Sequence, residues 1–242
     1  MRIALIGYGK MGKVIERIAL SKNHQIVLKI DIGNPQDFTK TNLQKADVAI
    51  EFTRPDAAVE NIKKCLEFGV PVVIGTTGWL QELENIQMLC EKQQGALLWA
   101  SNFSIGVNIF FEMNRYLAKM MNHAPQYEVD TEEIHHTQKL DAPSGTAITL
   151  AQDLIAILDK KQSWVNHASE NPNELEIISK RIDPAPGTHT IRYHSTVDSI
   201  EIKHTAHSRE GFAAGAVAAA EWLVGKKGCF QMRDMLAATW MK

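Results

Sequence analysis

The chain has 242 residues, of which 45% are hydrophobic and 22% charged, and its formal net charge is −2 at pH 7. This length suits one large domain or two small ones, and the composition is that of a soluble globular protein. Because there is no global basic field and no apolar run of membrane-spanning length, we expect neither nucleic acid nor a membrane as partner.

The cysteines are few and far apart: Cys65, Cys90 and Cys229. That pattern argues against a disulfide framework or a zinc site, and the nine histidines include no H-E-x-x-H spacing. The first apolar run, at residues 1–7, is too short for a signal peptide and ends in a glycine turn. We therefore expect no metal and a reducing, cytoplasmic location.

A glycine-rich loop follows the first predicted strand. Residues 2–6 and 25–30 are apolar runs typical of buried strands, and a helical pattern separates them. In such G-x-G-x-x-G loops the first glycine makes the turn, the second admits a pyrophosphate, and the third lets the helix pack closely; an acid after the next strand binds a ribose diol. The sequence therefore predicts a dinucleotide site. Its residues are Gly7, Tyr8, Gly9, Lys10, Met11, Gly12 and Asp31.

The alternation of strands and helices continues to about residue 104. Strands are predicted at 48–52, 70–74 and 96–99, with helices at about 53–68 and 80–93. This order predicts a doubly wound parallel sheet, in which ligands lie beyond the carboxyl ends of the strands. The turn after each of these strands, taken alone, fits a plain strand-to-helix connection. Together, however, the turns meet at the carboxyl edge of the predicted sheet. We therefore add Gly75, Thr76, Thr77, Ala100, Ser101, Asn102 and Phe103 to the predicted nucleotide site.

The pattern changes after Ser104. A helix at 108–121 carries an apolar stripe that we expect to be core, a strand follows at 127–134, and another helix starts after Ser144. Three strand-like runs at 175–181, 188–194 and 199–204 then lie on short connections, which predicts an antiparallel or mixed sheet. The two helix stripes are Ile109, Met113, Leu117 and Met121, and Ala147, Leu150, Ala151, Leu154 and Leu158.

The last predicted helix, at 212–224, is rich in alanine and carries a single charge, Glu221. A helix with such small side chains packs closely, and we expect it to pack on the first domain. The second domain is then an insertion. We predict a dinucleotide-binding Rossmann domain at 1–104 and 209–242, and an inserted α+β domain at 105–208, with hinges near Ser104 and Ser208.

The most informative stretch is 133–146. His135, His136 and Lys139 stand just before Ser144-Gly145-Thr146, which opens a helix. Histidine and lysine can transfer protons, and a helix start with hydroxyls and free N–H groups binds anions. The plain alternative is a polar strand end followed by an ordinary N-cap. The combination in this order favours chemistry on a small, negatively charged molecule.

The chain resembles the 4-hydroxy-tetrahydrodipicolinate reductase (dihydrodipicolinate reductase) family over essentially its whole length. Two departures concern Thr137 and Gln138, which are less basic than usual, and the glycine loop, whose short form occurs in only some members. The resemblance rests on Glu133-Ile134-His135-His136, Lys139, Asp141-Ala142-Pro143-Ser144-Gly145-Thr146, Phe52-Thr53-Arg54-Pro55, Gly75-Thr76-Thr77-Gly78, residues 101–108 and Met232-Arg233-Asp234.

The resemblance implies an enzyme that reduces 4-hydroxy-tetrahydrodipicolinate to tetrahydrodipicolinate with NADH or NADPH, in diaminopimelate and lysine biosynthesis. It implies that His135 is the catalytic proton donor and acceptor and Lys139 a second donor. It also implies that His136, Ser144, Gly145 and Thr146 hold this small dicarboxylate substrate. By the same resemblance, the α+β domain at 105–208 binds the substrate and assembles the protein into a homotetramer. Because substrate and cofactor then lie on different domains, we expect a closing motion.

Two other functions remain open from the residues alone. One is a different small dehydrogenase on the same layout, such as an amino-acid dehydrogenase, although a simple amine substrate does not require paired histidines with lysine and Ser-Gly-Thr. The other is a nucleotide-sensing regulator, which needs a DNA-binding or partner module. No basic helix-turn-helix pattern is present in the sequence. Fold alone does not decide among these functions.

Overall fold

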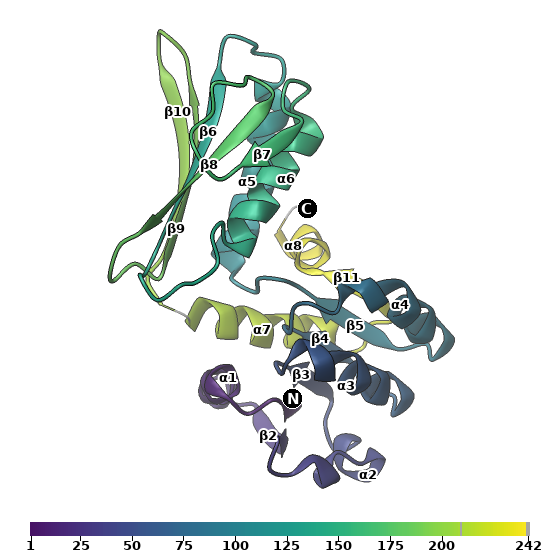
Figure 1. Cartoon of the computed structure of the whole chain (residues 1–242). Coiled ribbons are helices and arrows are strands. Elements are labelled where there is room, and N and C mark those ends of the chain that lie inside the picture. The colour runs from purple at the N-terminus through teal and green to yellow at the C-terminus, as the bar shows by residue number, and fades with distance from the viewer. Residues whose placement is uncertain (209, 241–242) are drawn as a thin grey trace. The chain divides into compact units, whose positions relative to one another are not determined.

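The computed structural model describes residues 1–208 and 210–240, except for the side chain of Trp240. The chain divides into two compact units (Figure 1). Unit 1 comprises Met1–Ile105 and Glu210–Lys242, and unit 2 comprises Gly106–Arg209. Unit 2 is therefore an insertion between two segments of unit 1.

Unit 1 is built on a six-stranded sheet in which all paired strands are parallel, in the order β11-β5-β4-β3-β1-β2. The chain winds outward in one direction through β1 and β2 and in the other through β3, β4 and β5, so the switch point lies between β1 and β3. This confirms the predicted doubly wound sheet. The strands are β1 (Arg2–Ile6), β2 (Gln25–Ile30), β3 (Val48–Glu51), β4 (Val72–Ile74), β5 (Ala96–Trp99) and β11 (Gly228–Gln231).

Helices cover both faces of this sheet, which is why its central strands are almost continuously apolar. Residues of α1, α7 and α8 form one core with one face, and residues of α3 and α4 form a second core with the other. The helical segments are α1 (Lys10–Ser21), η1 (Pro35–Asp37), α2 (Lys40–Leu43), α3 (Pro55–Glu67), η2 (Leu80–Glu82), α4 (Leu83–Lys92), α7 (Glu210–Leu223) and α8 (Met232–Trp240).

Helix α7 packs on unit 1, as its small side chains predict. Its buried residues include four alanines, Ala213, Ala216, Ala219 and Ala220. A Cβ atom at Gly215 would lie 1.7 Å from the carbonyl oxygen of Phe103. The backbone of α7 at Gly215 therefore lies closer to the turn after β5 than a residue with a side chain would allow.

Unit 2 contains a mixed five-stranded sheet in the order β10-β9-β6-β8-β7. Strands β10, β9 and β6 are antiparallel neighbours, whereas β6, β8 and β7 run parallel. Helices α5 and α6 contribute to a common core with one face of this sheet (Figure 1). The expected α+β organisation is confirmed. The elements are α5 (Ile105–Met121), β6 (Glu128–His135), α6 (Gly145–Ile157), β7 (Ser163–Val165), β8 (Glu174–Arg181), β9 (Gly187–His194) and β10 (Ser199–Ala206).

The two predicted helix stripes of unit 2 have different outcomes. The stripe of α6 is buried throughout, as expected. The prediction that the stripe of α5 is core was wrong, because the side chains of Ile109 and Met113 are 39% and 50% exposed. This helix is apolar around most of its circumference, and the stripe that contains Phe110 and Phe111 buries more apolar area.

Several short elements escape sequence patterning. Strands β7 and β11 have three and four residues, too few to show a period, and helix α8 follows β11 directly. The helix predicted at 80–93 is divided into η2 and α4, and β4 starts two residues later than predicted. Among the described residues, no helix has both the length and the apolar character that crossing a bilayer requires.

Candidate active site

The carboxyl ends of five strands in unit 1 are aligned by the sheet register. Ile6 at the end of β1 pairs with Ile30 of β2 and with Glu51 of β3. Glu51 in turn pairs with Ile74 of β4, which pairs with Trp99 of β5. The turns that follow these residues therefore lie along one edge, where doubly wound sheets bind nucleotides.

The three glycines of the first loop occupy the positions that their predicted roles require. Gly7 has a φ of +95°, and a Cβ atom there would lie 2.0 Å from the carbonyl oxygen of Phe52. A Cβ atom at Gly12 would lie 2.3 Å from the carbonyl oxygen of Gly7. Around Gly9, by contrast, a Cβ atom would meet nothing within 4 Å. Gly7 and Gly12 thus pack the loop, while Gly9 leaves its backbone open to a ligand.

Two cavities lie along this edge. One of about 410 Å³ is lined by Gly7, Gly9 and Asp31, among others. The other, of about 460 Å³, is lined by Gly9, Phe52 and Thr53, which also line the first cavity. The structure thus brings most of the predicted nucleotide residues together. The predicted residues of the second cavity are Gly9, Lys10, Met11, Gly75, Thr76 and Thr77.

Some predicted nucleotide residues are engaged elsewhere. The Tyr8 hydroxyl donates a hydrogen bond to Glu16, and the ammonium of Lys29 lies 4.6 Å from the centre of the Tyr8 ring. Phe103 is buried in the core of unit 1, with its ring 5.8 Å from that of Phe52. Because the Phe103 ring is buried in this core, only the backbone of Phe103 can contact a ligand. None of the residues 100–103 lines either cavity.

The cavity beside Asp31 also contains residues to which the sequence analysis assigned no role, although Arg54 belongs to one of the motifs that carry the resemblance. Arg54 and Lys64 line it and add positive charge, and Asn61 lines it as well. The amide of Asn61 donates to the buried carboxyl of Glu51, 3.3 Å away, and burial raises the pKa of that carboxyl. Arg54 immediately precedes α3, and Asn61 and Lys64 lie on that helix, so only the fold places them in the cavity that Asp31 lines.

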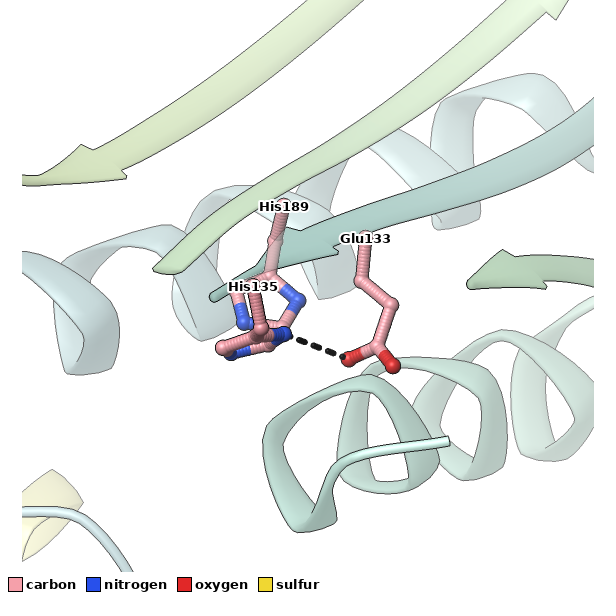
Figure 2. A group of neighbouring side chains, drawn as sticks. All are labelled: Glu133, His135 and His189. Carbon is pink, nitrogen blue, oxygen red and sulfur yellow. Dashed lines mark ion pairs between the residues drawn. The ribbon is translucent and has the colours of Figure 1, made fainter. Parts of the chain in front are cut away.

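The second candidate site lies on the helix-covered face of the unit 2 sheet. Glu133 and His135 are two residues apart on β6 and therefore share a face. In the strand register His189 of β9 and Ser179 of β8 stand on either side of Glu133. Figure 2 shows the resulting group of Glu133, His135 and His189, all of which are buried.

The carboxylate of Glu133 is the centre of this group. It is fully buried and accepts hydrogen bonds from the Ser144 backbone N–H at 3.1 Å and the Ser179 hydroxyl at 2.8 Å. The Arg181 guanidinium lies 3.5 Å away, and His135 Nδ1 lies 3.3 Å from the other carboxylate oxygen. Burial raises the pKa of Glu133, but the contacts with His135, Ser144 and Ser179 outweigh it and lower that pKa well below its usual value. Glu133 is therefore ionised at neutral pH.

His189 is the second imidazole of this group. Its ring centre lies 5.2 Å from that of His135 in an edge-on arrangement. Burial is the main cause that lowers the pKa of His189 to about 4, and any proton that His135 carries adds to this effect. His189 is therefore a neutral ring beside His135 at physiological pH.

The loop that carries the predicted lysine is held by one side chain from β8 and one from the turn after it. Arg181 donates to the backbone oxygens of Lys139 and Asp141, at 3.3 and 2.5 Å. Asp183 accepts hydrogen bonds from both the N–H and the hydroxyl of Thr137. The Lys139 ammonium lies 2.8 Å from both carboxylate oxygens of Asp141, whose side chain is 60% exposed. Such an exposed ion pair contributes little energy, so Lys139 can exchange Asp141 for another carboxylate.

Helix α6 begins where the sequence predicts it. Ser144 is its N-cap, and its hydroxyl accepts a hydrogen bond from the Ala147 N–H at 3.3 Å. Because Ser144 is only 3% exposed and its own N–H is bonded to Glu133, it acts here as a cap and anchor. Gly145 and Thr146 form the first helical turn, where N–H groups and the helix dipole favour anions.

Glu133, His135 and His189 each offer an atom that could ligate a metal, and these atoms lie within 4.8 Å of one another. The carboxylate of Glu133, however, already has Ser144, Ser179 and Arg181 as partners. A cation here would have to displace or repel the Arg181 guanidinium. The geometry therefore favours a proton-transfer group over a resident metal.

The fold and the two sites together define a class: a nicotinamide-nucleotide oxidoreductase with a Rossmann unit and an inserted α+β unit. Models of dihydrodipicolinate reductase match the chain at residues 1–103 (N-terminus) and 106–236 (C-terminus). The chain is 50% identical over 240 residues, 98% of both chains, to the 4-hydroxy-tetrahydrodipicolinate reductase of Christiangramia forsetii. It is 34% identical over 228 residues, 91% of this chain and 83% of the relative, to that of Neisseria meningitidis serogroup C. The chain belongs to the dihydrodipicolinate reductase family.

Solved structures agree with this assignment. A dipicolinate-bound dihydrodipicolinate reductase from Paenisporosarcina sp. TG-14 superposes with a TM-score of 0.78 at 25% identity, covering 96% of this chain and 97% of that one. An engineered D-amino acid dehydrogenase bound to NADP⁺ gives a TM-score of 0.54 at 14% identity, covering 99% of both chains. At that identity the likeness extends to the fold alone.

Four residues of the unit 2 site were not predicted from sequence: Ser179, Arg181, Asp183 and His189. They lie 33 to 43 residues beyond the end of the motif at Thr146, on β8, β9 and the turn between them. Glu133 was part of the recognised motif but had no assigned role. The one available signal was its position two residues before His135 on a predicted strand, which puts both side chains on one face.

Proposed function

We propose that the chain catalyses the reduction of 4-hydroxy-tetrahydrodipicolinate to tetrahydrodipicolinate with NADH or NADPH, in diaminopimelate and lysine biosynthesis in the cytoplasm. The observation that carries this proposal is the meeting of His135, the Lys139 loop and the start of α6 around the Glu133 carboxylate. That arrangement combines a proton donor with an anion site. Family membership and the dipicolinate-bound relative support a dicarboxylate as the ligand.

The chemistry divides between the two units. The bound nicotinamide nucleotide supplies the hydride, and the cavities beside Gly9 and Asp31 are where unit 1 would hold it. The overall reaction takes up one hydride and one proton and releases the 4-hydroxyl group as water, and loss of that water leaves a conjugated imine. Hydride addition to this imine leaves negative charge on the substrate, so a proton must be supplied. We propose that His135 donates it and that Lys139 is the second donor.

The substrate carboxylates need positive charge and hydrogen-bond donors. We propose that the first turn of α6, with Gly145 and Thr146, receives one carboxylate, and that His136 contacts the substrate beside it. Lys139 exchanges its exposed partner Asp141 for a substrate carboxylate. Ser144 fixes the start of the helix through its capping hydrogen bond. We propose that its side chain also contacts the substrate.

The proposal is tested by following NAD(P)H oxidation. Purified protein is mixed with 4-hydroxy-tetrahydrodipicolinate made enzymatically in the same cuvette. Turnover with this substrate, and none with simple amino acids or keto acids, is the expected result. Oxidation of an amino acid in the reverse direction, without activity on the cyclic substrate, would support an amino-acid dehydrogenase instead.

We expect NADH to be used well and NADPH to be accepted. The charge of Asp31 favours a free ribose 2′-hydroxyl and repels a 2′-phosphate, and the next residue is the apolar Ile32. Arg54 and Lys64 line the same cavity and offset that repulsion, whereas Lys10 lines the neighbouring one. Values of kcat/KM measured for both nucleotides check this. A hundredfold preference for NADPH, roughly 2.7 kcal/mol, would show that Asp31 does not select the nucleotide.

We also propose a homotetramer assembled through unit 2. Strand β10 is eight residues long and, among the strands that the structure describes, pairs with β9 alone; open edges of this length favour further pairing. The exposed apolar side chain of Val197 lies just before this strand, and that of Ile200 lies on it. Light scattering at micromolar protein concentration is expected to give four times the chain mass. A mass equal to one chain at that concentration would contradict this assembly.

A further inference from the structure

The buried face of the unit 2 sheet holds one carboxylate that touches the proposed proton donor. Glu133 Oε2 lies 3.3 Å from His135 Nδ1, and the pair is drawn with a dashed line in Figure 2. The contact is looser than an aligned hydrogen bond, and among the described residues Nδ1 has no other polar partner. Contacts of this kind are often long without substrate and tighten in the reacting complex.

The charge of Glu133 restricts which nitrogen of His135 carries the proton. An ionised carboxylate can only accept hydrogen bonds, and a neutral imidazole has one donor nitrogen and one acceptor nitrogen. The low pKa of Glu133 keeps it ionised, so the nitrogen that faces it is the one that bears hydrogen. The neutral His135 ring is then protonated at Nδ1 and bare at Nε2.

The opposite edge of the ring is left uncovered by a glycine. Gly187 is the first residue of β9, and a Cβ atom there would lie 3.1 Å from His135 Nε2 and 3.3 Å from Cδ2. Any other residue at this position would press a side chain against the nitrogen that must meet the substrate. The chain thus holds a carboxylate at Nδ1 and places a residue without a side chain beside Nε2.

Glu133 cannot turn away from this position without losing several contacts. Its other oxygen is bonded to the Ser144 N–H and the Ser179 hydroxyl and lies near Arg181. Ser144 caps α6, and Arg181 holds the backbone of the Lys139 loop. One carboxylate is therefore tied to the proton donor, to the anion-binding helix start and to the loop of the second donor.

We propose that Glu133 is a positioning residue that holds His135 as the Nδ1–H tautomer and so makes Nε2 the atom that exchanges the proton with substrate. The proposal rests on the proposed catalytic role of His135. When Nε2 gives up its proton, the ring that remains is the tautomer that Glu133 stabilises. The competing explanation is that Glu133 only neutralises Arg181 and anchors Ser144.

Three measurements separate these explanations. Nitrogen-15 NMR of the imidazole ring, recorded without substrate at a pH where the ring is neutral, reports the tautomer of His135 directly. Steady-state kinetics with NADH report kcat and KM, and titrations with NADH and dipicolinate report the two binding sites. The variants are Glu133→Gln and Glu133→Asp. The matched control is Glu132→Gln, which makes the same change one residue away, on the opposite face of β6, where Glu132 pairs with Lys180.

We expect the wild-type ring to be protonated at Nδ1. Glu133→Gln should populate the Nε2–H form and lower kcat by about 10² or more, the lower end for general acid catalysis. Its amide oxygen can still accept the Ser144 N–H, so affinities for NADH and dipicolinate should change by less than about threefold, or ~0.7 kcal/mol. Glu133→Asp should retain the tautomer and recover part of the rate, and Glu132→Gln should match wild type.

Each other outcome has a defined meaning. A wild-type ring protonated at Nε2 would overturn the proposal without any variant, so misfolding of Glu133→Gln would not leave it undecided. A fall in kcat with an unchanged tautomer, or with lost dipicolinate binding, would reduce Glu133 to a structural role. If the tautomer shifts in Glu133→Gln while His135→Gln keeps full kcat, the positioning contact is real and the proposed role of His135 is wrong.

Discussion

His135→Gln is expected to lower kcat by a factor of about 10² to 10⁴, the range that general acid catalysis supplies. Glutamine keeps a polar side chain of similar length but cannot give up a proton. Because the nucleotide cavities lie on unit 1 and His135 on unit 2, NADH affinity should be unchanged. Steady-state kinetics and a separate NADH titration measure the two effects.

Lys139→Ala should cost at least as much. It removes a proton donor and also the ammonium that can face a substrate carboxylate. Thr146→Val provides a contrast, because it removes one contact made in the ground state and should raise KM more than it lowers kcat. The three variants together distinguish loss of proton transfer from loss of binding.

The control for His135 is another histidine of the same sheet. His194 lies on β9 five residues from His189, hence on the opposite face, and its side chain is 47% exposed. His194→Gln should leave kcat unchanged. If His135→Gln also stayed within a factor of about two of wild type, the histidine would be an ordinary strand end, because that change is too small for a lost proton donor.

Gly7→Ala is expected to destabilise unit 1 strongly. At a φ of +95° an L side chain is strained, and its Cβ would lie 2.0 Å from the Phe52 carbonyl oxygen, which belongs to the adjacent strand end. The strain and the overpacking together cost roughly 2 to 5 kcal/mol. For a chain of this size that corresponds to a fall in Tm of roughly 5 to 15 °C, measurable by calorimetry.

Gly9→Ala is the matched substitution in the same loop. A Cβ atom there meets nothing within 4 Å, so Tm should stay within about 2 °C of wild type. The added methyl group instead occupies the space where a pyrophosphate would approach the backbone, and NADH affinity should fall by about tenfold, ~1.4 kcal/mol. Equal loss of stability in both variants would contradict the separate roles of these two glycines.

The sequence by itself determined the fold class, because the relevant signals are local. The period of apolar residues distinguishes the strands from the helices, and the alternation of the two in the first hundred residues dictates a parallel sheet. The glycine loop and the Ser144 N-cap are likewise local, since backbone geometry within a few residues selects glycine or a hydroxyl there. The His135 motif could be recognised for the same reason.

Tertiary structure decided which side chains surround those motifs. Ser179, Arg181 and His189 meet Glu133 only through the register of three strands, and a shift of one residue in any of them would turn its side chains to the other face. Arg54 and Lys64 likewise reach the Asp31 cavity only because α3 follows β3 at the switch point. The exposed stripe of α5 is a further case, since an apolar helix does not itself specify which side is buried. Periodicity within one element carries no information about its partners across the sheet, and pairing over such separations depends on the packing of the whole unit.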